Sequence, residues 1–357
     1  MTKKIVVYGA GAIGGQVGAR LSAAQDDVTL VDPWEPQVET VQRHGMVVHD
    51  AGGEHHYDPR IIRPAELERL GGPVDILFMC VKSYDTASAL EIILPYLAPD
   101  ALVVSLQNSI NEEIIAPVVG AERTYGGAIL INAVLLDPGH VTWSTSISQS
   151  GGGPSPGVIM GEYLRPAGPK TEELRGIMDA VWPAVASDNL MLERWTKLIT
   201  NCMVNVTAGI SGLRSAALLA NPLARDIIVG LAAEALYVAK ADGYDIEHIM
   251  GVYSPEQVHA CAAGASTEVQ EDLAVRATRI KPEAATSLLQ DVLRGRVTEV
   301  EYFNGLIARK GSVKGVATPL SSAATDMMHM VERGEVASAP ESLESLRPLL
   351  TTPAASG

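Results

Sequence analysis

Hydrophobic and polar positions change their spacing part-way along the chain. In the first third, short apolar runs rich in β-branched residues alternate with stretches in which apolar residues recur every three or four positions. The first spacing is typical of buried strands and the second of amphipathic helices. The apolar runs are residues 5–8, 28–31, 75–79 and 102–105. Because a helical stretch follows each run, the pattern predicts a parallel sheet with crossover helices, which is an α/β fold.

The pattern from residue 125 onward is extended rather than helical. Residues 125–136 and 140–145 are joined by Asp137-Pro138-Gly139, a sequence typical of turns. They predict an antiparallel hairpin that closes the sheet. The Gly- and Pro-rich residues 151–157 predict a loop.

Beyond about residue 168, helical spacing dominates. One predicted helix has Asn221 as its N-cap, Pro222 in its first turn, an apolar-periodic body through Ala239, and Gly243 after its end. Other predicted helices span residues 190–206, 283–293 and 319–331. From Ala337 the chain is rich in Ala, Ser and Pro, which predicts a poorly packed tail.

Length supports a division into domains. At about 100 to 200 residues per domain, a chain of 357 residues is expected to fold as two. The change in pattern predicts a doubly wound α/β domain at residues 1–188, an all-helical domain at 189–336, and a tail at 337–357.

Charge and composition narrow the class of protein. Forty-two acidic residues against 27 Lys and Arg give a formal charge of -15, which repels nucleic acid and anionic membrane surfaces. The apolar stretches are shorter than the ~18 to 20 residues that span a bilayer, and the run before Gly9 is too short for a secretory signal. Three widely spaced cysteines suggest neither a disulfide framework nor a thiolate metal site. We therefore expect a cytoplasmic protein whose partner is a small molecule, without nucleic acid or membrane.

A glycine-rich turn follows the first predicted strand. Gly9-Ala10-Gly11-Ala12-Ile13-Gly14 leads from that strand into a helix, the context in which this spacing binds a dinucleotide. Gly9 would form the tight turn, Gly11 would let the backbone approach a pyrophosphate, and Gly14 would let helix and strand pack closely. The helix N-terminus adds unpaired N–H groups and a partial positive charge. The alternative is a Gly-rich turn in another kind of α/β protein.

Asp32 ends the second predicted strand, 18 residues after Gly14. A carboxylate at this place can accept hydrogen bonds from the ribose hydroxyls of NAD, whereas it would repel the 2′-phosphate of NADP. The sequence therefore predicts NAD as the cofactor, with NADP less favoured. The alternative is that Asp32 only begins a turn with Pro33.

Polar residues follow the third and fourth predicted strands, where ligands bind in open parallel sheets. They include Lys82, in Val81-Lys82-Ser83-Tyr84, and Asn108, in Leu106-Gln107-Asn108-Ser109. Taken alone, Lys82 is equally well explained as a surface lysine and Asn108-Ser109 as an ordinary turn.

Lys197, Asn201 and Asn205 form a polar stripe in the helical half. At about 100° per residue they share one face of a helix, while Trp195, Leu198, Cys202 and Met203 occupy others. The alternative is a solvated helix face, but asparagine is a poor helix former and such a face more often carries Glu, Lys or Arg. One cation and two amides suit a small substrate with a carboxylate and a carbonyl. Farther on, Ser287 and Glu299 lie twelve residues apart, and ordinary helix caps explain them equally well.

Taken together, these motifs resemble the ketopantoate reductase (2-dehydropantoate 2-reductase) family from Lys4 to about Val331. The resemblance implies a dinucleotide-binding Rossmann domain followed by a helical domain like the C-terminal domain of 6-phosphogluconate dehydrogenase, with the active site between them. The resembling pieces, in order, are Gly9 to Gly14, Val81-Lys82-Ser83-Tyr84, Leu106-Gln107-Asn108, Lys197-x3-Asn201-x3-Asn205, Ser287-x-x-Gln290-Asp291, and Thr298-Glu299 with Asn304-Gly305.

The resemblance also implies roles for individual residues. Lys197 would be the general acid in reduction, and Glu299 would orient the substrate or Lys197. Asn201, Asn205 and Ser287 would hold substrate oxygens, and Lys82 and Asn108 would lie near the nicotinamide.

The chain departs from the family pattern at several positions. Members usually use NADPH and carry basic or neutral residues after the second strand, where this chain has Asp32. Ser109 stands where members usually have glycine, and a further asparagine downstream of Asn205 has no counterpart in residues 207–214. The departures leave two substrate classes open: ketopantoate itself, and another small 2-oxo or 2-hydroxy acid or a related alcohol, with NAD as the preferred cofactor.

Two other functions stay open at this point. One is an opine-type or imine dehydrogenase on the same two-domain plan, and the other is a non-catalytic NAD-binding sensor. We expect no metal site, because the eight histidines, among them His55-His56 in a predicted solvated loop, lack a matching set of acids. The sequence leaves a homodimer open.

Overall fold

The computed structural model describes residues 3–25, 27–145 and 156–351. It divides into two compact units, residues 1–194 and 195–357. We call these the N-terminal unit and the C-terminal unit. The predicted border at residue 188 lies six residues before this division. No helix among the described residues is long and apolar enough to cross a bilayer.

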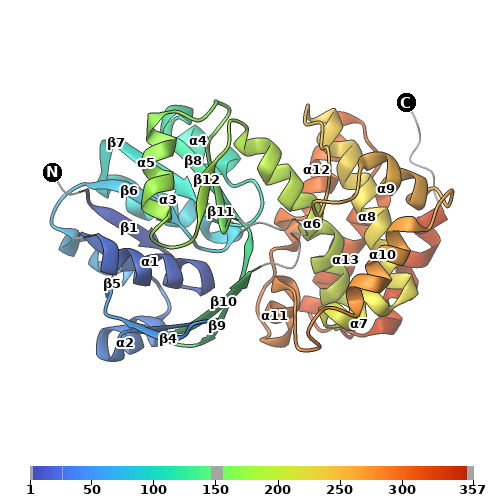
Figure 1. The fold of residues 1–357 in the computed structure, drawn as a ribbon, viewed down its shortest axis with the longest axis horizontal. Helices are drawn as coiled ribbons and strands as arrows, with labels where there is room; N and C mark the ends of the chain where they lie inside the picture. The colour runs from blue at the N-terminus through green and yellow to red at the C-terminus, as the bar shows by residue number, and fades with distance from the viewer. Residues whose placement is uncertain (1–2, 26, 146–155, 352–357) are drawn as a thin grey trace. The chain divides into compact units, whose positions relative to one another are not determined.

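An eight-stranded sheet forms the centre of the N-terminal unit (Figure 1). Its strand order is β12-β11-β8-β7-β6-β1-β2-β5, and the six strands from β5 to β8 are parallel. The order reverses at β1, which lies between β2 and β6, so a switch point for ligand binding is expected at the carboxyl end of β1. The strands are β1 (Ile5–Tyr8), β2 (Val28–Val31), β5 (Arg60–Ile62), β6 (Val74–Met79), β7 (Leu97–Ser105), β8 (Thr124–Ile129), β11 (Val158–Glu162) and β12 (Ala184–Ala186).

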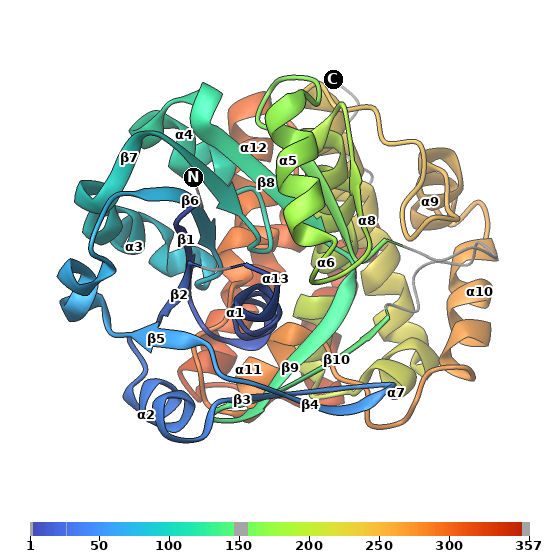
Figure 2. The same cartoon turned by 60° about the vertical axis from the view of Figure 1, so that its left-hand side comes forward.

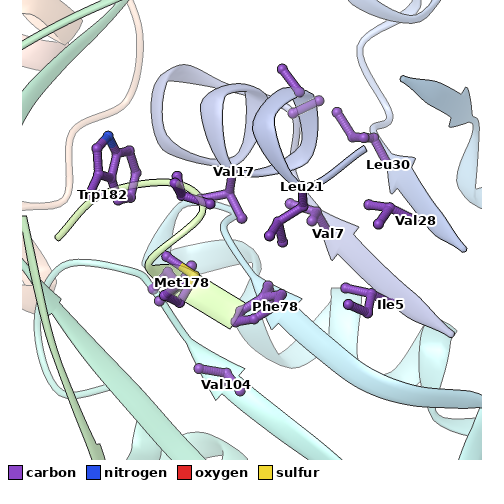
Figure 3. Close-up of a cluster of buried hydrophobic side chains, with 14 of the residues drawn as sticks. Ile5, Val7, Val17, Leu21, Val28, Leu30, Phe78, Val104, Met178 and Trp182 are labelled. Carbon is purple, nitrogen blue, oxygen red and sulfur yellow. The ribbon is translucent and has the colours of Figure 1, made fainter. Parts of the chain in front are cut away.

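Both faces of the sheet are covered, which explains why its central strands are apolar without alternation. Ile5 and Val7 of β1 enter one core cluster, while Val6 and Tyr8 enter the other. Figure 3 shows the first cluster, in which Val17 and Leu21 of α1 lie against β1. The helices of this unit are α1 (Ala12–Ala24), α2 (Glu35–His44), α3 (Thr86–Ile93), α4 (Glu112–Val119) and α5 (Pro169–Met178), with short 3-10 turns η1 (Pro64–Leu70), η2 (Ser83–Asp85), η3 (Leu94–Tyr96) and η4 (Ala121–Arg123).

A second sheet, with strand order β4-β3-β10-β9, packs against α1 (Figure 2). Its strands are β3 (Met46–Asp50), β4 (Gly53–Tyr57), β9 (Ile131–Asp137) and β10 (His140–Thr145). The predicted hairpin exists as β9 and β10, which pair antiparallel. The prediction that it closes the main sheet is wrong, because the extended stretch breaks at Leu130: β8 pairs with β7 in the main sheet and β9 begins the second sheet.

The C-terminal unit is built from helices, with α8 packed against five of its neighbours and against η6. Asn221 caps α8, accepting a hydrogen bond from the Ala224 N–H at 3.1 Å, as the sequence predicted. The elements are α6 (Leu190–Ser211), which begins in the N-terminal unit, α7 (Ser215–Ala220), α8 (Pro222–Ala241), α9 (Pro255–Ala262), α10 (Glu268–Ala277), α11 (Ser287–Leu293), η5 (Val300–Tyr302), α12 (Asn304–Lys314), α13 (Pro319–Glu332) and η6 (Pro340–Thr351).

Two further sequence-based predictions need correction. The stretch from Ala337 is packed rather than loose, because Leu343 and Leu346 of η6 are buried and the Ser338 hydroxyl donates to the Gly209 carbonyl at 2.6 Å. His55 and His56 lie on β4 rather than in a loop. The predicted loop at residues 151–157 and the tail after 351 lie outside the described residues, apart from residues 156 and 157.

Candidate functional site

The glycine-rich turn between β1 and α1 has three distinct clearances. Gly9 has φ +98°, and a Cβ there would lie 2.7 Å from the Cys80 carbonyl carbon. At Gly14 a Cβ would lie 1.7 Å from the Gly9 carbonyl oxygen, so helix and turn pack too closely for any side chain. At Gly11 a Cβ would meet nothing within 4 Å. The turn therefore packs closely at Gly9 and Gly14 and leaves open space at Gly11, where the main chain can approach a ligand. We call residues 9–14 the cradle.

The first turn of α1 is suited to an anion. Gly11 is its N-cap and supplies no side-chain hydrogen bond, and the first turn holds no acidic residue. Ala12 and Ile13 are half-buried. Main-chain N–H groups and the helix dipole thus lie at the open side of the cradle, where a phosphate would be stabilised.

Asp32 joins the end of β2 to this cradle. Its Oδ2 accepts the Ala10 N–H at 2.6 Å and its Oδ1 accepts the Trp34 N–H at 2.8 Å. The bond to Trp34 makes the turn that the sequence analysis weighed as an alternative, and the bond to Ala10 ties the same carboxylate to the cradle. Each oxygen keeps acceptor capacity for a further donor. Burial raises the pKa of Asp32, although the bonds to Trp34 and Ala10 oppose the rise.

Carboxylates lie near the carboxyl ends of β1 and β5, the strands on either side of β2. Burial, followed by the charges of Asp32 and Asp85, raises the pKa of Tyr8 to about 12. Arg63 follows β5, which pairs with β2, but its guanidinium lies 3.1 Å from Glu35, 3.7 Å from Glu66 and 3.9 Å from Glu39. This cation is already surrounded by carboxylates.

Lys82 and Asn108 lie on two loops that a buried network joins. Lys82 precedes η2 after β6, and Asn108 follows β7; both are half-buried. The Asn108 carbonyl accepts from the Asn111 amide at 2.6 Å and from the Ser83 hydroxyl at 3.3 Å. Other bonds of the network run from Asn111 to Ser83, from Gln107 to Thr86 and the Val81 carbonyl, and from Thr86 to Asn111.

Ser109 adopts a conformation that favours glycine. Its φ is 70°, and it is one of three residues other than glycine with a positive φ in the described chain. It is also buried, with 4% of its surface exposed. Strain of this kind, about 1 to 3 kcal/mol, is held in place by the surrounding contacts.

Arg194 anchors the first turns of α6 to the same edge of the sheet. It is 1% exposed, and its guanidinium donates to the carbonyls of Ser105 at 2.7 Å and Gln107 at 2.8 Å. It also donates from Nε to Glu112 at 2.8 Å. Arg194 and Glu112 could not be found from the sequence, because a buried arginine that lies 82 residues from its carboxylate partner leaves no local pattern.

In the C-terminal unit, Asn201, Asn205 and Ser287 lie together. The Asn205 Oδ1 accepts the Leu288 N–H at 3.3 Å and the Ser287 hydroxyl at 3.0 Å. The Asn205 amide nitrogen donates to Asn201 Oδ1 at 3.2 Å. The Asn201 Nδ2 is buried and has no acceptor among the described protein atoms. Since a main-chain N–H can only donate, this chain of bonds fixes both amides and leaves an N–H of Asn201 to offer.

Lys197 is half-buried on α6, one turn before Asn201. Glu299 is 2% exposed and precedes η5. The segment after Glu299 is tied to α6 because the Asn304 amide donates to the Cys202 carbonyl at 3.2 Å. Glu299 is also flanked by fixed neighbours: the Thr298 N–H donates to Glu332 at 2.7 Å, and His329 lies 2.9 Å from Glu301. No group of three or more metal-ligating side chains occurs within the described ranges.

The fold and the cradle define a protein with an NAD(P)-binding fold and a helical second half. Comparison with known families agrees over both halves. The family model described as ketopantoate reductase PanE/ApbA matches residues 5–150, and the model described as ketopantoate reductase PanE/ApbA C terminal matches residues 189–332. The chain therefore belongs to the ketopantoate reductase family of oxidoreductases.

Similar proteins cover nearly the whole chain. A 2-dehydropantoate 2-reductase from Archaeoglobus fulgidus is 27% identical over 338 residues, which are 93% of this chain and 99% of that protein. The structure of a D-mandelate dehydrogenase with NADH and anilino(oxo)acetate is 26% identical, with a TM-score of 0.75 over 93% of this chain and 99% of that one. A PanE/ApbA family ketopantoate reductase from Ralstonia eutropha JMP134 is 25% identical, with a TM-score of 0.73 and the same coverage.

Proposed function

We propose that this protein is an NAD(H)-dependent oxidoreductase that interconverts a small 2-oxo acid and its 2-hydroxy acid, or a related alcohol. The observation that carries the proposal is the cradle, closed at Gly9 and Gly14 and open at Gly11, with Asp32 bonded to it. When bound, the nicotinamide supplies or accepts the hydride. The residues Gly9, Ala10, Gly11, Ala12, Ile13 and Gly14 would hold the pyrophosphate, and Lys82 and Asn108 would lie on the nicotinamide side.

NAD is the favoured cofactor because of charge. A 2′-phosphate near Asp32 would meet a like charge, at a cost of about 1 to 4 kcal/mol at 4 Å separation. Arg63, which could offset that charge, is already engaged by Glu35 and Glu39. The similar D-mandelate dehydrogenase was solved with NADH, which also supports the preference.

Lys197 is the proposed general acid. In reduction its ammonium group donates a proton to the carbonyl oxygen of the substrate, and in oxidation the neutral amine takes the proton from the hydroxyl. Glu299 is the proposed partner that orients the substrate or Lys197, and its burial and fixed flanking residues suit a positioned carboxylate.

The hydrogen bonds among Asn201, Asn205 and Ser287 divide the proposed substrate-binding residues into two kinds. Asn201 offers an N–H, which fits a carbonyl or carboxylate oxygen of the substrate. Asn205 has both ends of its amide engaged, and Ser287 donates to it. We therefore assign substrate contact to Asn201 first, and to Asn205 and Ser287 the role of orienting it.

Replacing Lys197 tests the function. The wild type is screened spectrophotometrically for NADH oxidation and NAD reduction on a panel of 2-oxo and 2-hydroxy acids. Lys197→Ala is expected to lower turnover at least ~10²-fold on the best substrate. Lys197→Arg keeps the charge but cannot release a proton at working pH, so it should be nearly as slow. Lys240→Ala, on the exposed side of α8, is the matched control.

The same screen separates the alternatives. Activity only when an amine is added with the 2-oxo acid would identify an opine-type or imine dehydrogenase. NADH binding without turnover on any compound of the panel would identify a sensor. An active Lys197→Ala variant would remove Lys197 from the proposed role.

A further inference from the structure

Gln37 is a buried amide that the proposed function does not use. It lies in the first turn of α2 and is 0% exposed. Burying an amide without hydrogen-bond partners costs free energy, and the amide of Gln37 has two such partners. Its Nε2 donates to the Ala10 carbonyl at 2.7 Å, and its Oε1 accepts the Gly139 N–H at 2.8 Å. The side chain thus joins the cradle to the turn between β9 and β10.

The orientation of this amide follows from its partners. The Gly139 N–H can only donate and the Ala10 carbonyl can only accept, so the oxygen faces Gly139 and the nitrogen faces Ala10. A carboxylate of the same shape would lack the donor, and a thioether or alkyl chain would lack both groups. Among side chains of this length, only a neutral group with one donor and one acceptor satisfies both partners.

Ala10 is consequently held at both of its main-chain groups. Its N–H donates to Asp32 at 2.6 Å, and its carbonyl accepts from Gln37. In a trans peptide, the N–H of Gly11 points away from the carbonyl of Ala10. Because the Ala10 carbonyl is held toward α2, the Gly11 N–H points to the opposite side. Gly11 is the residue at which a Cβ would meet nothing within 4 Å.

We propose that Gln37 is a positioning residue for the dinucleotide pyrophosphate. It sets the plane of the Ala10–Gly11 peptide so that the Gly11 N–H faces the phosphate, and it makes this setting depend on the β9–β10 turn. The proposal rests on the proposed function only in that NAD(H) binds at the cradle.

The test measures NADH affinity directly, without any substrate. Gln37→Met removes both hydrogen bonds at similar volume, and NADH binding is titrated by fluorescence. Loss of a buried hydrogen bond that aligns the phosphate donor is expected to weaken binding about tenfold. The matched control is Gln42→Met on the same helix, where the exposed Gln42 donates to the Ile61 carbonyl at 3.1 Å and not to the cradle. The control should bind NADH as the wild type does.

Gln37→Glu distinguishes the loss of one hydrogen bond from general damage to the fold, because its NADH affinity should depend on pH. The ionised carboxylate lacks the donor for Ala10, whereas the protonated acid can donate to Ala10 and accept from Gly139. We expect the NADH affinity of this variant, relative to wild type at the same pH, to recover as the pH is lowered. Comparing the variant with the wild type at each pH removes the effect of the titration of Asp32, which contacts Ala10 in both proteins.

The outcomes are distinct. If the wild type does not bind NADH, the proposed function fails. If the wild type binds it and Gln37→Met and Gln37→Glu bind it equally well at every pH, the inference about Gln37 is overturned. Weaker NADH binding by Gln37→Met supports the inference. If Gln37→Met does not fold, a pH-dependent loss of NADH affinity in Gln37→Glu that the wild type does not show supports it instead.

Discussion

At the scale of single residues, Arg194 and Glu112 form an ion pair that is almost fully buried. Arg194 donates to three carbonyls, one at the end of β7, one two residues after it and one within β8, and Glu112 supplies its counter-charge. Burial raises the pKa of Glu112, and Arg194 opposes the rise. Such a pair contributes little net stability compared with apolar residues, but losing one partner leaves a buried charge unpaired.

We therefore expect Glu112→Ala to destabilise the N-terminal unit by about 3 to 5 kcal/mol. Urea unfolding followed by tryptophan fluorescence measures this, since Trp182 is buried in that unit. Glu344→Ala, which removes an exposed ion pair with Arg347, should leave the unfolding midpoint unchanged. Equal midpoints for Glu112→Ala and wild type would show that Arg194 does not need this carboxylate.

Residues such as Gln37, Arg194 and Asn111 could not be predicted from the sequence. Each acts through partners distant along the chain, for example Gln37 with Gly139 at a separation of 102 residues. Gly9, Gly14 and Asp32 do leave a local pattern, because their spacing within the strand–helix–strand unit β1-α1-β2 is set by local geometry.

At the scale of elements, His329 ties α13 to the segment that carries Glu299. Its ring lies 2.8 Å from Glu332 and 2.9 Å from Glu301. Burial lowers the pKa of His329, but its hydrogen bonds to Glu301 and Glu332 outweigh burial, and the net pKa is raised. The protonated ring therefore favours the folded state.

The sign of the pH dependence follows from that raised pKa. The stabilisation is complete below the ordinary histidine pKa of about 6.5 and is lost as the pH rises through the raised folded value. We expect the unfolding free energy of the C-terminal unit to fall above neutral pH in wild type and to change less in His329→Gln. His248→Gln, on an exposed site, is the control and should follow wild type. Parallel curves for wild type and His329→Gln would contradict the expectation.

Elements also differ in how well the sequence predicts them. β1 and β2 could be predicted because every position is buried on both faces of the sheet. β4 could not, because Gly53, Glu54 and His56 are exposed and polar, so the strand has no apolar pattern. η6 was missed because Leu343 and Leu346 are the only two buried apolar side chains described among many polar ones.

At the scale of the whole molecule, the proposed preference for NAD over NADP should appear as a difference in stability. A ligand that binds only the folded state stabilises it by about 2.7 kcal/mol at a concentration of about 100 times its Kd. We expect NADH to raise the melting temperature more than NADPH at equal concentration, because the 2′-phosphate of NADPH would meet the like charge of Asp32. In Asp32→Asn the difference should shrink. A larger shift with NADPH than with NADH would overturn the preference.

In the proposed function the nicotinamide exchanges hydride with the carbon that carries the substrate oxygen. NADH with deuterium at both positions of the nicotinamide C4 is supplied with the best 2-oxo acid of the panel, and the product is analysed by mass spectrometry and NMR. We expect a 2-hydroxy acid with deuterium at C2. An unlabelled hydroxy acid, or deuterium at C2 of an amine product, would contradict it.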